Sequence, residues 1–127
     1  MTSRNLFTTG RVLMAIIFIA AGIRKLLTYS ATLGYFASLG IPLPDIVLPL
    51  AILIELGGAT ALVIGWRTPW VAGLLGAFCI ASALLAHRFW AVDGPQSANQ
   101  LIHFLKNVAM LGGFLVLAAM AQERRSE

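Results

Sequence analysis

The chain has 127 residues, of which 59% are hydrophobic and 11% are charged, and its mean hydropathy is +0.87. This composition excludes an ordinary soluble globular domain and indicates an integral membrane protein. The net charge of +4 comes from basic residues that stand singly or in pairs at the ends of apolar runs. That arrangement is typical of membrane anchoring, so we expect contact with the lipid bilayer and no nucleic-acid partner.

The first predicted span covers about residues 8–27 and is flanked by basic side chains. Arg11 stands near one end, and Arg24 and Lys25 stand at the other. Several uncharged runs in the chain approach the roughly 20 residues that a hydrocarbon core of about 30 Å requires. Long basic side chains at the ends of such a run can extend to the membrane surface. The pattern therefore predicts a transmembrane helix.

The segment that follows, residues 28–45, predicts a short helix lying in the membrane interface. Tyr29, Leu33 and Phe36 follow helical spacing. Tyrosine is enriched at the level of the lipid headgroups, and an amphipathic segment of this length is too short to cross the bilayer.

The second and third predicted spans cover about residues 47–65 and 69–87. The second contains Glu55 in the middle of an otherwise apolar run. Thr68 followed by Pro69 is typical of an N-cap and first helical residue, so the third span begins there. A connection this short requires the two spans to be antiparallel neighbours.

The fourth predicted span covers about residues 98–121, where Ser97 and Gln100 match a capping box. The fold class is therefore all-α: an integral membrane four-helix antiparallel bundle, with one domain over residues 1–127. With four spans both termini lie on one side of the membrane, which we expect to be the cytoplasmic side because it carries slightly more positive charge. The basic residues on that side are Arg4, Arg11, Arg67, Arg124 and Arg125, against Arg24, Lys25, Arg88 and Lys106 on the other.

Polar residues of all four spans fall in one leaflet and form the candidate site. Glu55 and Lys106 lie at similar depths, so an ion pair between them is geometrically available. His103, Lys106 and Asn107 follow helical spacing and predict a polar stripe on the fourth helix. Isolated ions inside a membrane are costly and mark functional sites by default. The candidate ligand-binding residues are Lys25, Glu55, His87, His103, Lys106 and Asn107.

Other readings of the same residues stay open. Glu55 and Lys106 would equally serve as a structural ion pair that fixes helix register. Glu55 with His87 and His103 supplies metal-ligand or haem-ligand types, but their estimated depths disagree, so we assign no metal. Cys79, the single cysteine, lies within a span and predicts apolar packing. Small residues indicate close helix packing: Gly57 with Ala61 and Gly73 with Ala77, spaced by four, together with Gly58 and the pair Gly112 and Gly113.

Several segments together resemble the DoxX family of small four-helix bacterial membrane proteins, over nearly the full length. They are residues 18–25, 40–42, 49–58, 65–68, 87–89 and 104–107, followed by Gly112 and Gly113. The resemblance implies a multi-pass protein of the bacterial inner (plasma) membrane. It also implies an association with redox chemistry, because the family is related to subunits of thiosulfate:quinone oxidoreductase. No catalytic residue is assigned.

Two functional hypotheses remain. In the first, the protein is a redox-associated accessory that holds a quinone or similar small molecule between its helices, with electrons supplied by a redox partner protein. In the second, it is a non-enzymatic membrane scaffold or partner-docking subunit whose polar cluster is structural. Transport is a weaker third reading, since four short spans rarely enclose a path unless the chain forms a homo-oligomer.

Overall fold

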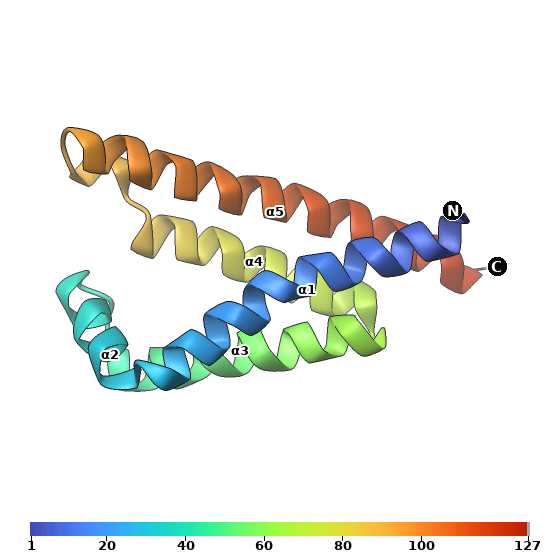
Figure 1. The fold of residues 1–127 in the computed structure, drawn as a ribbon, viewed down its shortest axis with the longest axis horizontal. Helices are drawn as coiled ribbons and strands as arrows, with labels where there is room; N and C mark the ends of the chain where they lie inside the picture. The colour runs from blue at the N-terminus through green and yellow to red at the C-terminus, as the bar shows by residue number, and fades with distance from the viewer. Residues whose placement is uncertain (127) are drawn as a thin grey trace.

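The computed structural model describes residues 1–126, and nearly all of them are helical. Four helices are long and apolar enough to cross a membrane. The predicted all-α, four-span architecture is therefore confirmed (Figure 1). In chain order the elements are α1 (Ser3–Leu27), α2 (Tyr29–Ser38), α3 (Pro44–Ile64), α4 (Thr68–Ala86), a 3-10 turn η1 (Phe89–Ala91) and α5 (Pro95–Ser126).

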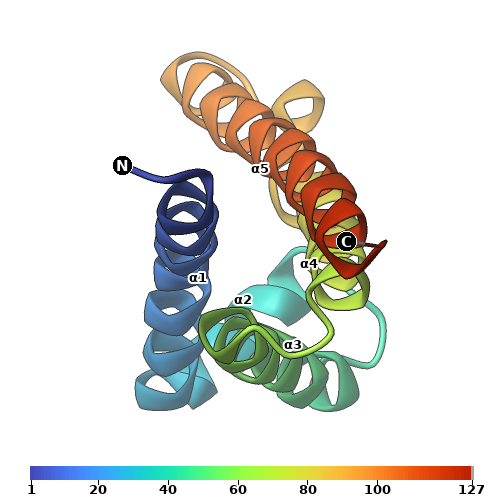
Figure 2. The ribbon, with the colours of Figure 1, turned by 90° about the vertical axis from the view of Figure 1, so that its right-hand side faces the viewer.

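The four long helices are arranged as two pairs. Helix α1 packs mainly against α3, and α4 packs mainly against α5, whereas α1 and α5 touch only sparsely. Both termini lie at one end of the bundle, and α2 lies at the other (Figure 1). Viewed from the end that holds the termini, α1 and α5 stand on opposite sides of the molecule (Figure 2). We call these the terminal end and the α2 end.

The apolar core joins the two pairs and lies toward the terminal end. Phe18 of α1 contacts Phe78 of α4 and Phe114 of α5, with ring centroids 6.4 and 5.7 Å apart. Leu62, shortly before the α3–α4 turn, and Leu75, two turns into α4, are fully buried. Toward the α2 end the buried positions include the polar residues Glu55 and Asn107. Two of the three buried polar residues therefore lie in the α2 half, and the third, Thr68, lies at the α3–α4 turn.

Glycines at the C-terminal ends of α2 and α3 allow the sharp turns that follow these helices. Helix α3 ends at Ile64, and Gly65 follows with φ of +79°, a left-handed conformation that favours glycine. Trp66 N–H donates to the Ala61 carbonyl and Gly65 N–H to the Leu62 carbonyl, which is a Schellman motif. Gly40 ends α2 in the same way, with φ of +73°. These turns bring α3 against α4 and return the chain from α2 into α3.

The helix starts differ from the sequence predictions at two positions. Helix α4 begins at Thr68 itself, with Arg67 in the N-cap position and no side-chain cap, so the prediction of Thr68 as N-cap was wrong. Helix α5 begins at Pro95, where a missing N–H costs nothing, so the capping box at Ser97 was also wrong. The Ser97 hydroxyl instead donates to the Phe89 carbonyl, at 2.9 Å, and ties α5 to the 3-10 turn.

The outer faces of the helices are apolar and exposed, as a bilayer requires. Leu13, Leu53 and Leu115 are 61%, 66% and 62% exposed. Close packing is confirmed at Gly58 and Gly113, where a Cβ would lie 2.9 Å from Leu75 and 3.0 Å from Met14. The prediction is wrong for Gly57, Gly73 and Gly112, where a Cβ would meet no atom within 4 Å. Instead, a Cβ at Gly22 would lie 2.6 Å from Leu56, where α1 crosses α3. The helix contacts of α3 therefore involve Gly58, Ala61 and Leu56 but not Gly57.

Candidate functional site in the α2 half of the bundle

Lys25 and Glu55 form an ion pair that links α1 to α3. The Lys25 Nζ donates to both carboxylate oxygens of Glu55, at 2.8 and 3.1 Å. Glu55 is buried, with 3% of its surface exposed, whereas the Lys25 side chain is 21% exposed. Within residues 1–126 this is the only ion pair. The buried Glu55 carboxylate is therefore paired, and part of the Lys25 side chain remains exposed.

The predicted pairing of Glu55 with Lys106 was wrong, and helix direction explains why. Side chains on a helix lean toward its N-terminus. Helix α1 runs toward the α2 end, so Lys25, near its last turn, leans back into the membrane and reaches Glu55. Helix α5 starts at the α2 end, so Lys106 leans toward the surface, and α5 packs on α4 rather than on α3.

Two histidines stack on each other where α4 ends beside α5. The rings of His87 and His103 are 5.1 Å apart between centroids and 23° from parallel. The Nδ1 of His87 is 2.8 Å from Oε1 of Gln100, which fixes the orientation of that ring. Both histidines are half-buried. Two imidazoles therefore present ring nitrogens at one place on the inner side of the α4–α5 pair.

The polar stripe on α5 is only partly as predicted. Asn107 is buried and its Nδ2 donates to the His103 carbonyl, at 3.0 Å, one turn earlier on the same helix. Lys106 is exposed and is not part of an ion pair within residues 1–126. At about 100° per residue, Lys106 lies about 60° to one side of His103 and Asn107 about 40° to the other. The buried face of α5 thus passes through Asn107 and leaves Lys106 at its edge.

Two residues that sequence reasoning did not place at the site help to build it. Gln100 was assigned to a cap, yet it holds His87. Its position three residues before His103 was the available signal, since i and i+3 share a helix face. Arg88 was interpreted as a membrane anchor, but its Nη2 donates to the Leu39 carbonyl at 2.6 Å. This bond connects the α4–α5 connection to the end of α2 across the α2 end of the bundle.

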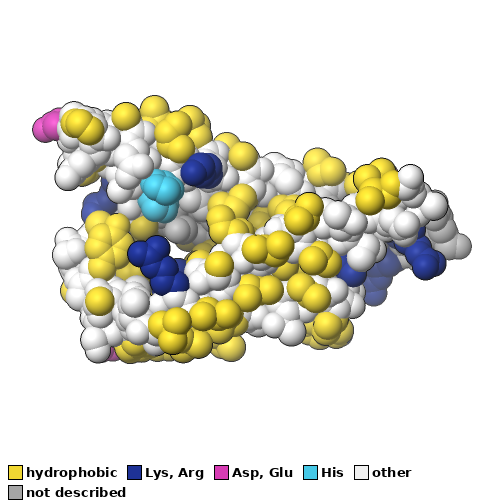
Figure 3. Space-filling model, in the orientation of Figure 1, with side chains coloured by type: hydrophobic (Ala, Val, Ile, Leu, Met, Phe, Trp, Pro, Cys, Tyr) yellow, Lys and Arg dark blue, Asp and Glu magenta, His cyan; other side chains and the backbone are white. Residues whose placement is uncertain are grey.

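The surface of this half is hollowed between the helix pairs. Figure 3 shows the histidine surface between two separate basic groups, beside a depression in the apolar wall. Helices α1 and α3 contribute Lys25 and Glu55, whereas α4 and α5 contribute the histidines and Lys106. Within residues 1–126 no three histidine, cysteine or acidic residues lie close enough together to hold a metal ion. Glu55, His87 and His103 therefore do not form a metal site in this part of the chain. The arrangement offers hydrogen-bond donors along an apolar opening.

Comparison with known proteins supplies the family. The sequence profile described as DoxX matches residues 6–88. The chain belongs to the DoxX family. It is 33% identical over 113 residues to the inner membrane protein YphA of Escherichia coli (strain K12), covering 89% of this chain and 81% of that protein. It is 39% identical over 109 residues to the inner membrane protein YqjF of the same organism, covering 86% and 78%. No solved structure matches it significantly.

The DoxX match and the four apolar helices together describe a multi-pass inner-membrane protein. The matched range covers α1 to α4 and includes Lys25, Glu55 and His87. It ends at Arg88, before α5, so His103, Lys106 and Asn107 lie outside it. The ion pair of α1 and α3 therefore falls entirely within the part of the chain that defines the family.

Proposed function

We propose that this DoxX protein is a redox-associated accessory of the inner membrane, and that the hollow in its α2 half binds a quinone or similar small amphipathic molecule. The observation that carries the proposal is the combination of unpaired donors with a lateral, apolar opening. Quinone carbonyls accept hydrogen bonds and quinone tails are apolar, so a ligand of this class needs both features.

Lys106 supports the proposal most strongly. It is a charged side chain within the apolar length of α5, exposed, and without a carboxylate partner in residues 1–126. An ammonium group within the apolar length of a membrane helix is costly, and a ligand carbonyl would partly offset that cost. The ring of His103 lies on the same helix three residues earlier and stacks on His87. A carbonyl between them would have a charged donor on one side and an imidazole on the other.

Proton exchange at this place would come from the histidines. An imidazole ring nitrogen can donate or accept a proton, and reduction of a quinone carbonyl to a hydroxyl requires a proton donor. Electrons would come from a separate redox partner protein of the membrane. In this account Lys25 and Glu55 hold α1 and α3 at the mouth of the opening, and Asn107 holds the His103 turn of α5.

Tryptophan fluorescence gives a direct test, because Trp90 lies beside the polar half whereas Trp66 and Trp70 lie at the α3–α4 turn. A Trp66→Phe/Trp70→Phe chain in nanodiscs would be titrated with a short-tailed ubiquinone. We expect saturable quenching, and an apparent affinity about tenfold weaker in Lys106→Met, since a hydrogen bond to a charged group contributes about 1.5 kcal/mol or more. Arg24→Gln, an exposed cation of α1, is the control. Linear quenching that is identical in all chains contradicts the proposal.

A scaffold role is the second candidate, and a specific observation favours it. Both oxygens of Glu55 are satisfied by Lys25, so the pair joins α1 to α3 whether or not a ligand is present. If the polar half is purely structural, Lys106→Met would change neither quenching nor the binding of any quinone, whereas Lys25→Met would still destabilise the bundle. The two candidate functions therefore predict different effects of Lys106→Met on quinone binding, but the same loss of stability in Lys25→Met.

A further inference from the structure

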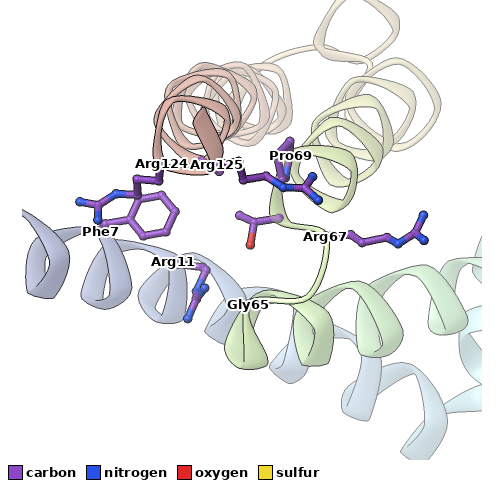
Figure 4. Close-up of a pocket in the computed structure, with 9 residues that line it drawn as sticks. Phe7, Arg11, Gly65, Arg67, Pro69, Arg124 and Arg125 are labelled. Carbon is purple, nitrogen blue, oxygen red and sulfur yellow. The ribbon is translucent and has the colours of Figure 1, made fainter. Parts of the chain in front are cut away.

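The other end of the bundle carries a cavity that the proposed function does not use. It has a volume of about 250 Å³ and lies where the start of α1, the α3–α4 turn and the end of α5 meet (Figure 4). A second hollow of about 210 Å³ is lined by Arg67, Trp70 and Arg125. The first cavity is many times larger than the space that one water molecule needs. That is ample for a phosphate group.

Four arginines from three separate segments line this cavity. Arg11 comes from α1, Arg67 from the α3–α4 turn, and Arg124 and Arg125 from α5. The preference for basic residues on one side of a membrane accounts for arginines at this end, but it does not require them to share one cavity. We call these four residues the arginine cluster.

No carboxylate neutralises the arginine cluster within residues 1–126. Glu55 pairs with Lys25, and Asp45 and Asp93 lie in segments at the α2 end. Glu123 is exposed, does not line the cavity and forms no ion pair in this part of the chain. Like charges gathered without counter-charge repel one another, so the cluster is stable only with an anion or with water and salt around it.

The Arg11 side chain is only partly satisfied by the protein. Its Nε is buried and has no hydrogen-bond partner within residues 1–126, although its Nη2 donates to the Val63 carbonyl at 3.4 Å. A buried donor without a partner costs about 1–3 kcal/mol, and such groups are rare in native structures. The guanidinium packs directly against the backbone of Gly65, where a Cβ would clash with it, so it cannot move in that direction.

The surroundings of the cluster suit a phosphate group. The Phe7 ring lies 5.7 Å from the guanidinium carbon of Arg11 and 4.8 Å from that of Arg124, which positions both side chains before any ligand arrives. Thr68, the first residue of α4, also lines the cavity, and a helix N-terminus attracts negative charge. Arginine forks match phosphate oxygens two at a time.

We propose that the arginine cluster binds an anionic phosphate group at the terminal end of the bundle. The chemistry is that of a phosphate monoester or diester, which an anionic phospholipid headgroup or a soluble phosphate compound would supply. The cations stand at the ends of the spanning helices, at the level of the headgroups, so both sources reach them. The four side chains point in different directions (Figure 4), so binding turns Arg11, Arg124 and Arg125 toward the phosphate oxygens, while Arg67 lies on the side of the second hollow.

The test uses the full chain in a neutral detergent, with binding of phosphatidylglycerol followed by native mass spectrometry. Each arginine near an anionic headgroup is worth about fivefold in affinity. We expect Arg67→Gln/Arg125→Gln, two exposed positions, to bind about 25-fold more weakly than the parent chain. The matched control is Arg4→Gln/Arg24→Gln, which removes two exposed arginines away from the cavity and should stay within about twofold of the parent.

Two further arms identify the source and guard against a folding artefact. Sodium phosphate that displaces the lipid, compared with sodium chloride of equal ionic strength, would indicate a soluble phosphate ligand, and failure to displace it would indicate a headgroup. Arg11→Lys keeps the charge but removes Nε, and we expect it to weaken binding while leaving the melting temperature near the parent's. Equal lipid binding by both double variants, or binding of phosphatidylcholine as tight as phosphatidylglycerol, overturns the proposal.

Discussion

The two ends of this bundle treat charge in opposite ways. Toward the α2 end, one carboxylate is buried in the middle of α3 and a lysine from α1 reaches inward to neutralise it. At the terminal end, four arginines gather around a cavity and no carboxylate in residues 1–126 pairs with them. The difference teaches that depth decides whether an ion needs a protein partner. Mid-membrane it does, whereas at headgroup level water, salt and phosphate are available.

Among the variants that test this comparison, Lys25→Met should lower the unfolding free energy most. This change leaves Glu55 buried without a partner, and breaking a buried ion pair in this way costs about 3–5 kcal/mol of unfolding free energy. Unfolding in mixed micelles with increasing dodecyl sulfate measures it. Glu55→Gln should cost less, because the Lys25 side chain is 21% exposed and can turn to the surface. A Lys25→Met/Glu55→Gln chain should recover most of the loss, and no recovery would contradict the assignment.

Gly22→Leu tests whether α1 and α3 must approach closely beside that pair. A Cβ at Gly22 would lie 2.6 Å from Leu56, so we expect a loss of about 1–3 kcal/mol in unfolding free energy. The same micelle titration applies. Gly57→Leu on the lipid-facing side of α3 meets no atom within 4 Å at its Cβ and serves as the matched control. Equal losses of unfolding free energy in the two variants would show that Gly22 is not needed for the close contact between α1 and α3.

Gln100→Ala tests whether the histidine stack is held in place. Removal of the 2.8 Å contact to His87 should cost about 1 kcal/mol, since a hydrogen bond of this kind makes a net contribution of that size. The melting temperature reports the loss, and the imidazole resonances of His87 and His103 report the change in the stack. Gln96→Ala, an exposed glutamine of the first turn of α5, is the control. Unchanged histidine resonances in Gln100→Ala would contradict the geometry of the stack.

Arg125→Gln should have the smallest effect on stability. It is exposed and forms no ion pair within residues 1–126, so we expect the unfolding free energy to change by about 0.5 kcal/mol or less in detergent without anionic lipid. A loss as large as that of Lys25→Met would mean that the terminal end depends on a protein counter-charge, and the contrast between the two ends would disappear.

Apolar run length and helical spacing were enough to predict the four spans, the short helix after the first span and the burial of Glu55, although both predicted N-caps were wrong. The partner of Glu55 was not predictable from depth alone. Depth places Lys106 level with Glu55, but side-chain direction along each helix selects Lys25, and that direction matters only once the pairing of α1 with α3 is known. The same limitation hid Gln100, whose role depends on where α4 ends.

The arginine cluster could not be predicted from the sequence for a related reason. In the sequence its members stand 56 residues apart between Arg11 and Arg67, and a further 57 before Arg124, and each is explained singly as a membrane anchor. Only the fold brings the start of α1 and the end of α5 to the same turn. Sequence spacing predicts contacts within one helix, whereas sites between helices depend on which faces pack.

The measurement that tests the central claim most directly is extraction of the small molecules that remain bound to the purified protein, followed by mass spectrometry. The parent chain, Lys106→Met and Arg24→Gln would be compared in a mild detergent. If the polar half holds a quinone or similar molecule, the parent and Arg24→Gln will retain it near one per chain and Lys106→Met will lose most of it. Equal background lipid in all three, with no such molecule, would contradict the account and leave the polar half as a structural cluster.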